Sequence, residues 1–129
     1  MSEHVTYHIS RITSEHSDWL RSIEFYQQEL EILKKRLAEV SAKYTNQDVK
    51  AEVEHFQNQF IVQRNNLDEL HHSIGEHVKH LKQDAAAMGQ HLSNVTLAEH
   101  DVRREDLEIL EKVINNLRHE FNRFLSRYM

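Results

Sequence analysis

The sequence predicts an all-α fold, an antiparallel up-down-up bundle of three long helices that dimerisation completes. Three observations indicate this fold: the 129 residues include no proline, they include only two glycines, and apolar residues recur at alternating steps of four and three. Proline and glycine most often break helices and form turns, so their near absence favours long helices with short connections. The alternating spacing is the heptad pattern of a helix that packs against other helices.

The first predicted helix spans residues 4–43. Its apolar seam contains one polar member, His16. The seam consists of Val5, Ile9, Ile12, His16, Trp19, Ile23, Tyr26, Leu30, Leu33, Leu37, Val40 and Tyr44. Whether residues 1–13 belong to this helix stays open, because Thr13 and Ser14 are also suitable N-cap residues for a helix that begins there.

The second predicted helix spans residues 47–92, with Thr45 as its N-cap and Asp48 in its first turn. Its seam consists of Val49, Val53, Phe56, Phe60, Gln63, Leu67, Leu70 and Ile74. Beyond Gly75 two registers are open. The unchanged register turns inward His77, Leu81, Asp84, Met88 and His91. A slip of one residue turns inward Val78, Leu81, Ala85, Met88, Leu92 and Val95, which is the more apolar set.

The third predicted helix spans residues 97–128. Thr96 and Glu99 have the spacing of a capping box at its start. Its seam consists of His100, Arg103, Leu107, Leu110, Ile114, Leu117, Phe121, Phe124 and Tyr128. Short connections make consecutive helices antiparallel, so residues 1–129 are expected to form a single helical-bundle domain.

Composition excludes several function classes. The net charge is -5 and the charged residues, 29% of the chain, are mixed in sign, which is unlike a nucleic-acid-binding surface. No apolar run approaches the roughly 20 residues of a membrane span, and no secretory signal is recognisable at the N-terminus. We therefore expect a cytoplasmic protein with neither nucleic acid nor membrane as partner. The chain also lacks a glycine-rich phosphate loop and a Ser-His-Asp grouping, so we do not expect an enzyme.

Histidines are the candidate functional residues, because the chain has eleven of them and imidazole is the commonest metal ligand. Residues at equal distances from the short connections of antiparallel helices are expected at the same level of the bundle. This places His16 and His77 near Glu111, and it places His4, His8, His91 and His100 at the open end. The candidate ligands for zinc, copper or iron are therefore His16, His77, His91 and His100. A ferritin-like site is excluded, because it needs a Glu-x-x-His unit on two helices, and such units, as in Glu69 and His72, occur on the second predicted helix alone.

A structural role is the alternative for these histidines. His16 and His77 can be polar seam residues that hydrogen-bond each other and set the register of the bundle. Five other histidines fall on outward positions and are expected at the surface: His55, His71, His72, His80 and His119.

Apolar residues at outward positions suggest an interface. Phe25 and Ile32 are seven residues apart on the first helix, and Val62 on the second helix is expected at a similar level. Such a patch can be covered by a second copy of the chain, and two-fold dimers are the commonest oligomers. The amide-rich segment around Phe60 is a possible partner-facing surface, with Gln57, Asn58, Gln59, Gln63, Asn65 and Asn66.

Two leading functional hypotheses follow, and an enzyme of unrecognised type ranks last. The first is a non-catalytic structural or protein-interaction module that forms a homodimer, uses no cofactor and presents its polar faces to a protein partner. The second is a helical bundle that binds a divalent metal ion through histidines from the N-terminus, the end of the second helix and the start of the third.

Overall fold

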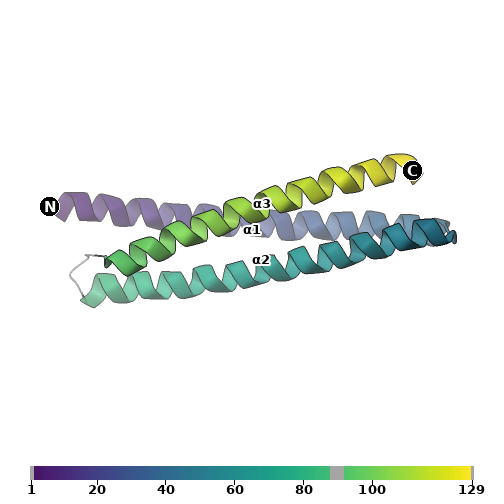
Figure 1. The fold of residues 1–129 in the computed structure, drawn as a ribbon. Helices are drawn as coiled ribbons and strands as arrows, with labels where there is room; N and C mark the ends of the chain where they lie inside the picture. Colours follow the sequence, from purple (N-terminus) through teal and green to yellow (C-terminus); the bar gives the residue numbers. More distant parts are fainter. Residues whose placement is uncertain (1, 88–91, 129) are drawn as a thin grey trace. The chain divides into compact units, whose positions relative to one another are not determined.

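The computed structural model describes residues 2–87 and 92–128, and describes no side chain of residues 2–8. It is all-α, with three long helices that pack together: α1 (Ser2–Lys43), α2 (Gln47–Ala87) and α3 (Asn94–Tyr128) (Figure 1). No strand occurs in the described ranges. The all-α class predicted from the heptad pattern is confirmed. None of the helices in the described part of the chain has the length and apolar character needed to cross a membrane.

The first two helices begin at residues other than the expected caps. Because α1 starts at Ser2, Thr13 lies inside the helix, where its Oγ1 donates to the carbonyl oxygen of Ile9 at 3.0 Å. Thr13 is therefore no N-cap. The expected cap of α2, Thr45, is also wrong, because Oδ1 of Asn46 accepts the backbone N–H of Asp48 at 2.7 Å. Asn46 stands directly before Gln47, so its side chain is the one in reach of the free amides.

The start of α3 differs from the expected boundary at residue 97 and from the expected capping box. Ser93 is the N-cap, since its Oγ accepts the backbone N–H of Thr96 at 3.2 Å and its carbonyl oxygen accepts that of Leu97 at 3.1 Å. Thr96 is consequently a buried residue of the first turn, and its Oγ1 donates to Asp84 at the end of α2. Glu99 therefore does not form the expected capping box with Thr96. The expected end of the second helix, residue 92, lies past the described end of α2 at Ala87.

Each helix contributes to two compact units. The first unit is built from the described residues of 1–23 and 68–108, and the second from those of 24–67 and 109–129. The second unit has a conventional core, in which the phenylalanine rings of α2 and α3 interlock. Phe56 lies 5.2 Å from Phe121 and 5.1 Å from Phe124 between ring centroids, and Phe60 lies 5.2 Å from Phe121.

The first unit has a mixed core, which also decides the register beyond Gly75. His77 is buried whereas Val78, the residue of the slipped register, is only half-buried, so the register continues unchanged at this point and the slipped register is wrong. A slip of the register would need a local distortion of the helix. The described α2 is one uninterrupted helix, so it keeps its 3.6-residue period. As a result, a histidine rather than a valine faces the interior.

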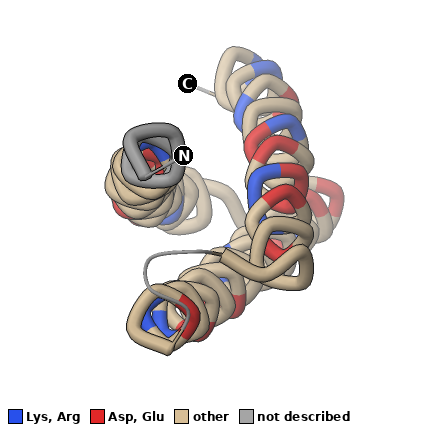
Figure 2. The backbone as a smooth tube through the Cα atoms, turned by 90° about the vertical axis from the view of Figure 1, so that its left-hand side faces the viewer, with Lys and Arg blue, Asp and Glu red and all other residues tan. Residues whose placement is uncertain are grey.

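Charged residues of both signs are interspersed along α3, as the blue and red segments of the backbone show in Figure 2. In the second unit they form ion pairs between helices, including Arg118 with Glu29 at 3.5 Å and Arg127 with Glu52 at 3.2 Å. Such pairs contribute about 0–1 kcal/mol each, so the buried seam carries most of the stability.

Candidate metal centre

Three buried histidines, one from each helix, meet inside the first unit. His16 on α1, His77 on α2 and His100 on α3 are 5%, 2% and 3% exposed. One nitrogen of each ring lies within 4.8 Å of the other two. Nδ1 of His100 is 3.2 Å from Nε2 of His77 and 3.2 Å from Nε2 of His16. These three inner nitrogens are close enough to one another to be ligands of one metal ion.

The cluster differs from the two groups that the sequence suggested. His100 joins His16 and His77, whereas it was expected with the end group, and His91 of that group lies outside the described residues. Because α3 begins at Asn94, His100 lies nearly two turns into the helix and reaches the level of His77. The prediction that Glu111 lies beside His16 and His77 is wrong, because Glu111 belongs to the second unit.

Glu111 has a different role there. Its Oε2 accepts a hydrogen bond from the hydroxyl of Tyr26 at 3.3 Å, and that hydroxyl in turn accepts one from Nδ2 of Asn115 at 3.3 Å. This carboxylate therefore satisfies a tyrosine at a helix contact. His4 and His8, also placed in the expected end group, belong to the residues whose side chains are not described.

Trp19, the only tryptophan of the chain, covers one side of the cluster. Its ring stacks on that of His100 with a centroid distance of 4.5 Å and an interplanar angle of 27°, and it lies 5.3 Å from the ring of His16. The indole excludes water from this side and also gives the site a built-in fluorescent reporter.

Each of two histidines turns its outer nitrogen toward a carboxylate of another helix. Nδ1 of His77 lies 3.5 Å from Oε2 of Glu99 on α3, and Nε2 of His100 lies 3.5 Å from Oε1 of Glu15 on α1. Both nitrogens are buried, and neither forms a hydrogen bond with any described group. A buried polar atom without a partner is costly, so these two positions call for an explanation.

The two carboxylates are themselves held in place. Arg104 donates to Oε2 of Glu15 from Nη2 at 2.7 Å and from Nε at 3.1 Å, and Arg11 lies 3.6 Å from the other oxygen. On the opposite side, Nδ1 of His80 lies 3.0 Å from Oε2 of Glu99. Each carboxylate is therefore fixed between an outer basic group and a buried histidine.

Burial keeps the three imidazoles neutral. It lowers the pKa of His16 to about 4, and positive charge on the neighbouring histidines would lower it further. Burial also lowers the pKa of His77, against the raising effect of Glu99. The pKa of His100 is lowered in the same way, against the raising effect of Glu15. Neutral imidazole is the form that binds metal ions.

The two carboxylates are ionised at neutral pH. Burial alone would raise the pKa of Glu15, but the hydrogen bonds and the positive charge of Arg104 outweigh it, with a smaller effect from the contact with His100, and lower the pKa. The contact with His80 is the main cause that lowers the pKa of Glu99. Two ionised carboxylates thus border a neutral histidine cluster.

Sequence reasoning missed Glu15 and Glu99, although the sequence carries a signal for them. A glutamate directly precedes each histidine of the cluster, in Glu15-His16, Glu76-His77 and Glu99-His100. On a helix, neighbouring residues point about 100° apart, so a glutamate before a buried histidine lies at the border of the buried seam. From there Glu15 and Glu99 reach a histidine of the adjacent helix.

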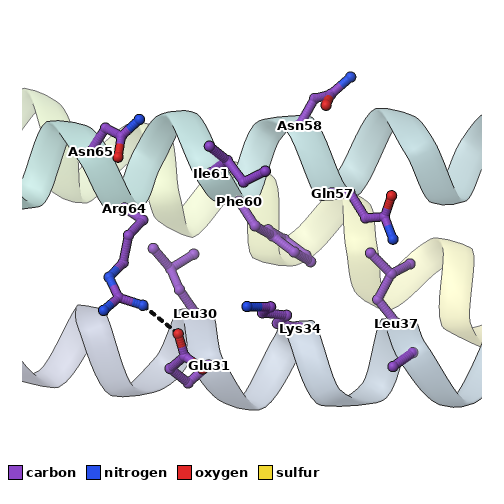
Figure 3. Close-up of a pocket in the computed structure, with 11 residues that line it drawn as sticks. Leu30, Glu31, Lys34, Leu37, Gln57, Asn58, Phe60, Ile61, Arg64 and Asn65 are labelled. Carbon is purple, nitrogen blue, oxygen red and sulfur yellow. Dashed lines mark hydrogen bonds and ion pairs between the residues drawn. The ribbon is translucent and has the colours of Figure 1, made fainter.

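The second unit carries a groove of about 500 Å³ between α1 and α2 (Figure 3). Leu30 and Phe60 contribute apolar surface to it, and an ion pair between Glu31 and Arg64 spans it at one end. Its α2 side carries uncharged amides, among them Asn58 and Asn65.

The residues of the expected interface are exposed. Phe25 is 54% exposed, Ile32 49% and Val62 47%, as their outward positions predicted. The five histidines expected at the surface are exposed as well: His55, His71, His72, His80 and His119.

Comparisons with known proteins add no relative: no family model, no curated protein and no solved structure matches the chain.

The buried histidines predict how the stability of the metal-free protein depends on pH. His16 in the unfolded chain takes up a proton near its ordinary pKa of 6.5, whereas the folded protein resists this uptake until about pH 4. The free energy of unfolding therefore falls as the pH drops from 7 to 5, and His16 contributes up to about 2 kcal/mol of this loss. Urea unfolding with a chelator present measures it.

Two variants control this measurement. Replacing His16 with Leu should flatten the decline between pH 7 and 5, while His119→Leu, at an exposed position of α3, should leave it unchanged. An equally steep decline in His16→Leu would contradict the assignment of the pH dependence to the buried cluster.

Proposed function

We propose that this protein binds a divalent transition-metal ion at His16, His77 and His100. The observation that supports this proposal is the convergence of three neutral, buried imidazole nitrogens within 4.8 Å of one another. An ion at their centre would accept one lone pair from each ring, and zinc is bound by histidine at about 2.0–2.1 Å. The ligands come from all three helices, so binding would tie together the first unit.

The donor set selects the class of ion. Imidazole suits zinc, copper, nickel, cobalt and iron, whereas calcium and magnesium prefer oxygen ligands. Three histidines leave at least one coordination position for water or another ligand, since zinc takes four ligands in a tetrahedral site. The proposal therefore names zinc as the first ion to test, with copper and cobalt as spectroscopic substitutes.

A purely structural cluster is the competing interpretation. Histidines that only set the register of a bundle should hydrogen-bond through both ring nitrogens, because an unpaired buried nitrogen lowers stability. Nδ1 of His77 and Nε2 of His100 have no such bond within the described part of the chain. A metal ion gives the inner nitrogens a partner without using an N–H, which leaves both outer nitrogens as donors.

Metal binding is tested directly on the tag-free chain. Calorimetric titration of the chelator-treated protein should give one zinc ion per chain, and His77→Ala should weaken binding at least ~100-fold because one of three ligands is lost. Copper at the cluster should also quench the fluorescence of Trp19, whose ring stacks on His100 at 4.5 Å.

A matched variant separates specific binding from binding by surface histidines. His72 is exposed on the same helix as His77, so His72→Ala should keep both the stoichiometry and the affinity. Stoichiometric zinc binding that persists in His77→Ala, or its absence in the unaltered protein, would falsify the proposal.

We also propose the up-down-up course of the helices as the frame of the site. Contacts within the second unit support it. Glu29 pairs with Arg118 and the hydroxyl of Tyr44 donates to the carbonyl oxygen of Tyr128, so residue numbers rise together in α1 and α3. Along α2 they run the other way, because Phe60 meets Phe121 and the earlier Phe56 meets the later Phe124.

A second candidate function is that of a homodimeric interaction module. The exposed Phe25, Ile32 and Val62 support it, since a second copy of the chain would cover them. The groove of the second unit adds a further argument. Primary amides both donate and accept hydrogen bonds, so a border with Asn58 and Asn65 can face its own copy without like-charge repulsion.

Dimer formation is tested with the double variant Phe25→Glu, Ile32→Glu. The two added charges should convert a dimer to a monomer, as measured by light scattering at several concentrations, because buried charges without partners oppose association. The control variant Ser10→Glu, Ala42→Glu adds the same charge at exposed positions of α1 that lie at least ten residues from Phe25 and Ile32, and it should remain dimeric. An unaltered protein that is monomeric throughout contradicts this candidate.

A further inference from the structure

The buried histidine cluster contains a hydrogen-bonding conflict. A neutral imidazole carries one N–H and one lone pair, and a carboxylate can only accept. Glu99 therefore favours the proton on the outer Nδ1 of His77, and Glu15 favours it on the outer Nε2 of His100. A hydrogen bond between the two rings needs a proton on one of the inner nitrogens. It therefore cannot form while both rings carry their single proton on the outer nitrogen.

The conflict is located at the inner nitrogens. If both outer nitrogens carry protons, Nε2 of His77 and Nδ1 of His100 face each other with lone pairs at 3.2 Å. If one inner nitrogen carries the proton instead, the outer nitrogen of the same ring presents its lone pair to a carboxylate. A cation between the rings removes the conflict, because it accepts both inner lone pairs.

We propose that Glu15 and Glu99 are positioning residues that hold His100 as the Nε2–H tautomer and His77 as the Nδ1–H tautomer, so that the opposite nitrogens bind the divalent ion. This inference rests on the proposed function and assigns the ligand atoms, with Nδ1 from His100 and Nε2 from His77 and from His16. Carboxylates that bind the outer N–H of a ligating histidine fix its orientation and raise its basicity.

The surroundings suit this role. Glu15 is held by Arg104 at 2.7 Å and Glu99 contacts His80 at 3.0 Å, so neither carboxylate needs to be drawn from solvent when the ion binds. The two distances of 3.5 Å to the buried rings are slightly long for a hydrogen bond. Both should shorten when an ion fixes the rings.

The test combines nitrogen NMR of the histidine rings with zinc titration of the full chain at pH 7. In the metal-free and the zinc-loaded protein, the proton should be on Nδ1 of His77 and on Nε2 of His100. Glu99→Leu should move the proton of His77 toward Nε2 in the metal-free protein and weaken zinc binding ~10- to 100-fold. Glu99→Gln retains an oxygen acceptor and should retain the tautomer, with a smaller loss of affinity.

Control and contradicting outcomes are distinct. Glu105→Leu, at an exposed position of α3, should change neither the tautomer nor the affinity. The inference is overturned if Glu99→Leu leaves both unchanged, or if His77 carries protons on both nitrogens in the metal-free protein, because an extra proton then occupies the centre. Failure of the unaltered protein to bind zinc refutes the proposed function, while the metal-free tautomers still decide the role of the carboxylates.

Discussion

Three imidazoles buried at one level of a helical seam are the constraint on which the first unit depends. Burying a polar atom without a hydrogen bond destabilises a fold by about 1–3 kcal/mol, and the cluster contains two such atoms, Nδ1 of His77 and Nε2 of His100. The surrounding features respond to this constraint. Trp19 covers the rings, and Glu15 and Glu99 face the outer nitrogens from other helices. The cluster is polar in its inner contacts and acidic at its border, which suits a cation.

The second unit shows what the same three helices need for packing alone. At the positions that correspond to a seam, it buries phenylalanine rings such as Phe121 and Phe124, both 0% exposed. This largely aromatic and aliphatic core provides the hydrophobic free energy of burial with few polar groups that must be satisfied, such as Gln63. Histidines at seam positions of the first unit are therefore not explained by stability. Departures from such local consistency are expected at functional sites.

The sequence predicts the helices and the inward direction of the histidines, because both follow from a single periodicity. His16, His77 and His100 occupy seam positions that can be counted along each chain segment. Which residues meet across helices depends on where each helix begins, and a start at Asn94 rather than residue 97 shifts the level of every α3 residue. Together with the end of α2 at Ala87 rather than at residue 92, this shift moves the α3 position that lies level with His77 toward His100 and away from Glu111.

The carboxylates were missed for a related reason. Glu15 and Glu99 lie beside the seam rather than in it, so heptad counting assigns them to the solvated surface. Their roles depend on contacts with a histidine of another helix, and such contacts require the relative rotation of two helices. The glutamate before each clustered histidine is the local signal that could have identified them.

The central claim is that the inner nitrogens of His16, His77 and His100 bind one divalent ion. X-ray absorption spectroscopy of the zinc-loaded protein tests it most directly, because this method reports the identity and distance of the atoms around zinc. We predict three imidazole nitrogens at about 2.0–2.1 Å, in a four-coordinate shell. A shell of oxygen atoms with one imidazole or none would contradict the account and would leave the cluster a structural feature of the bundle.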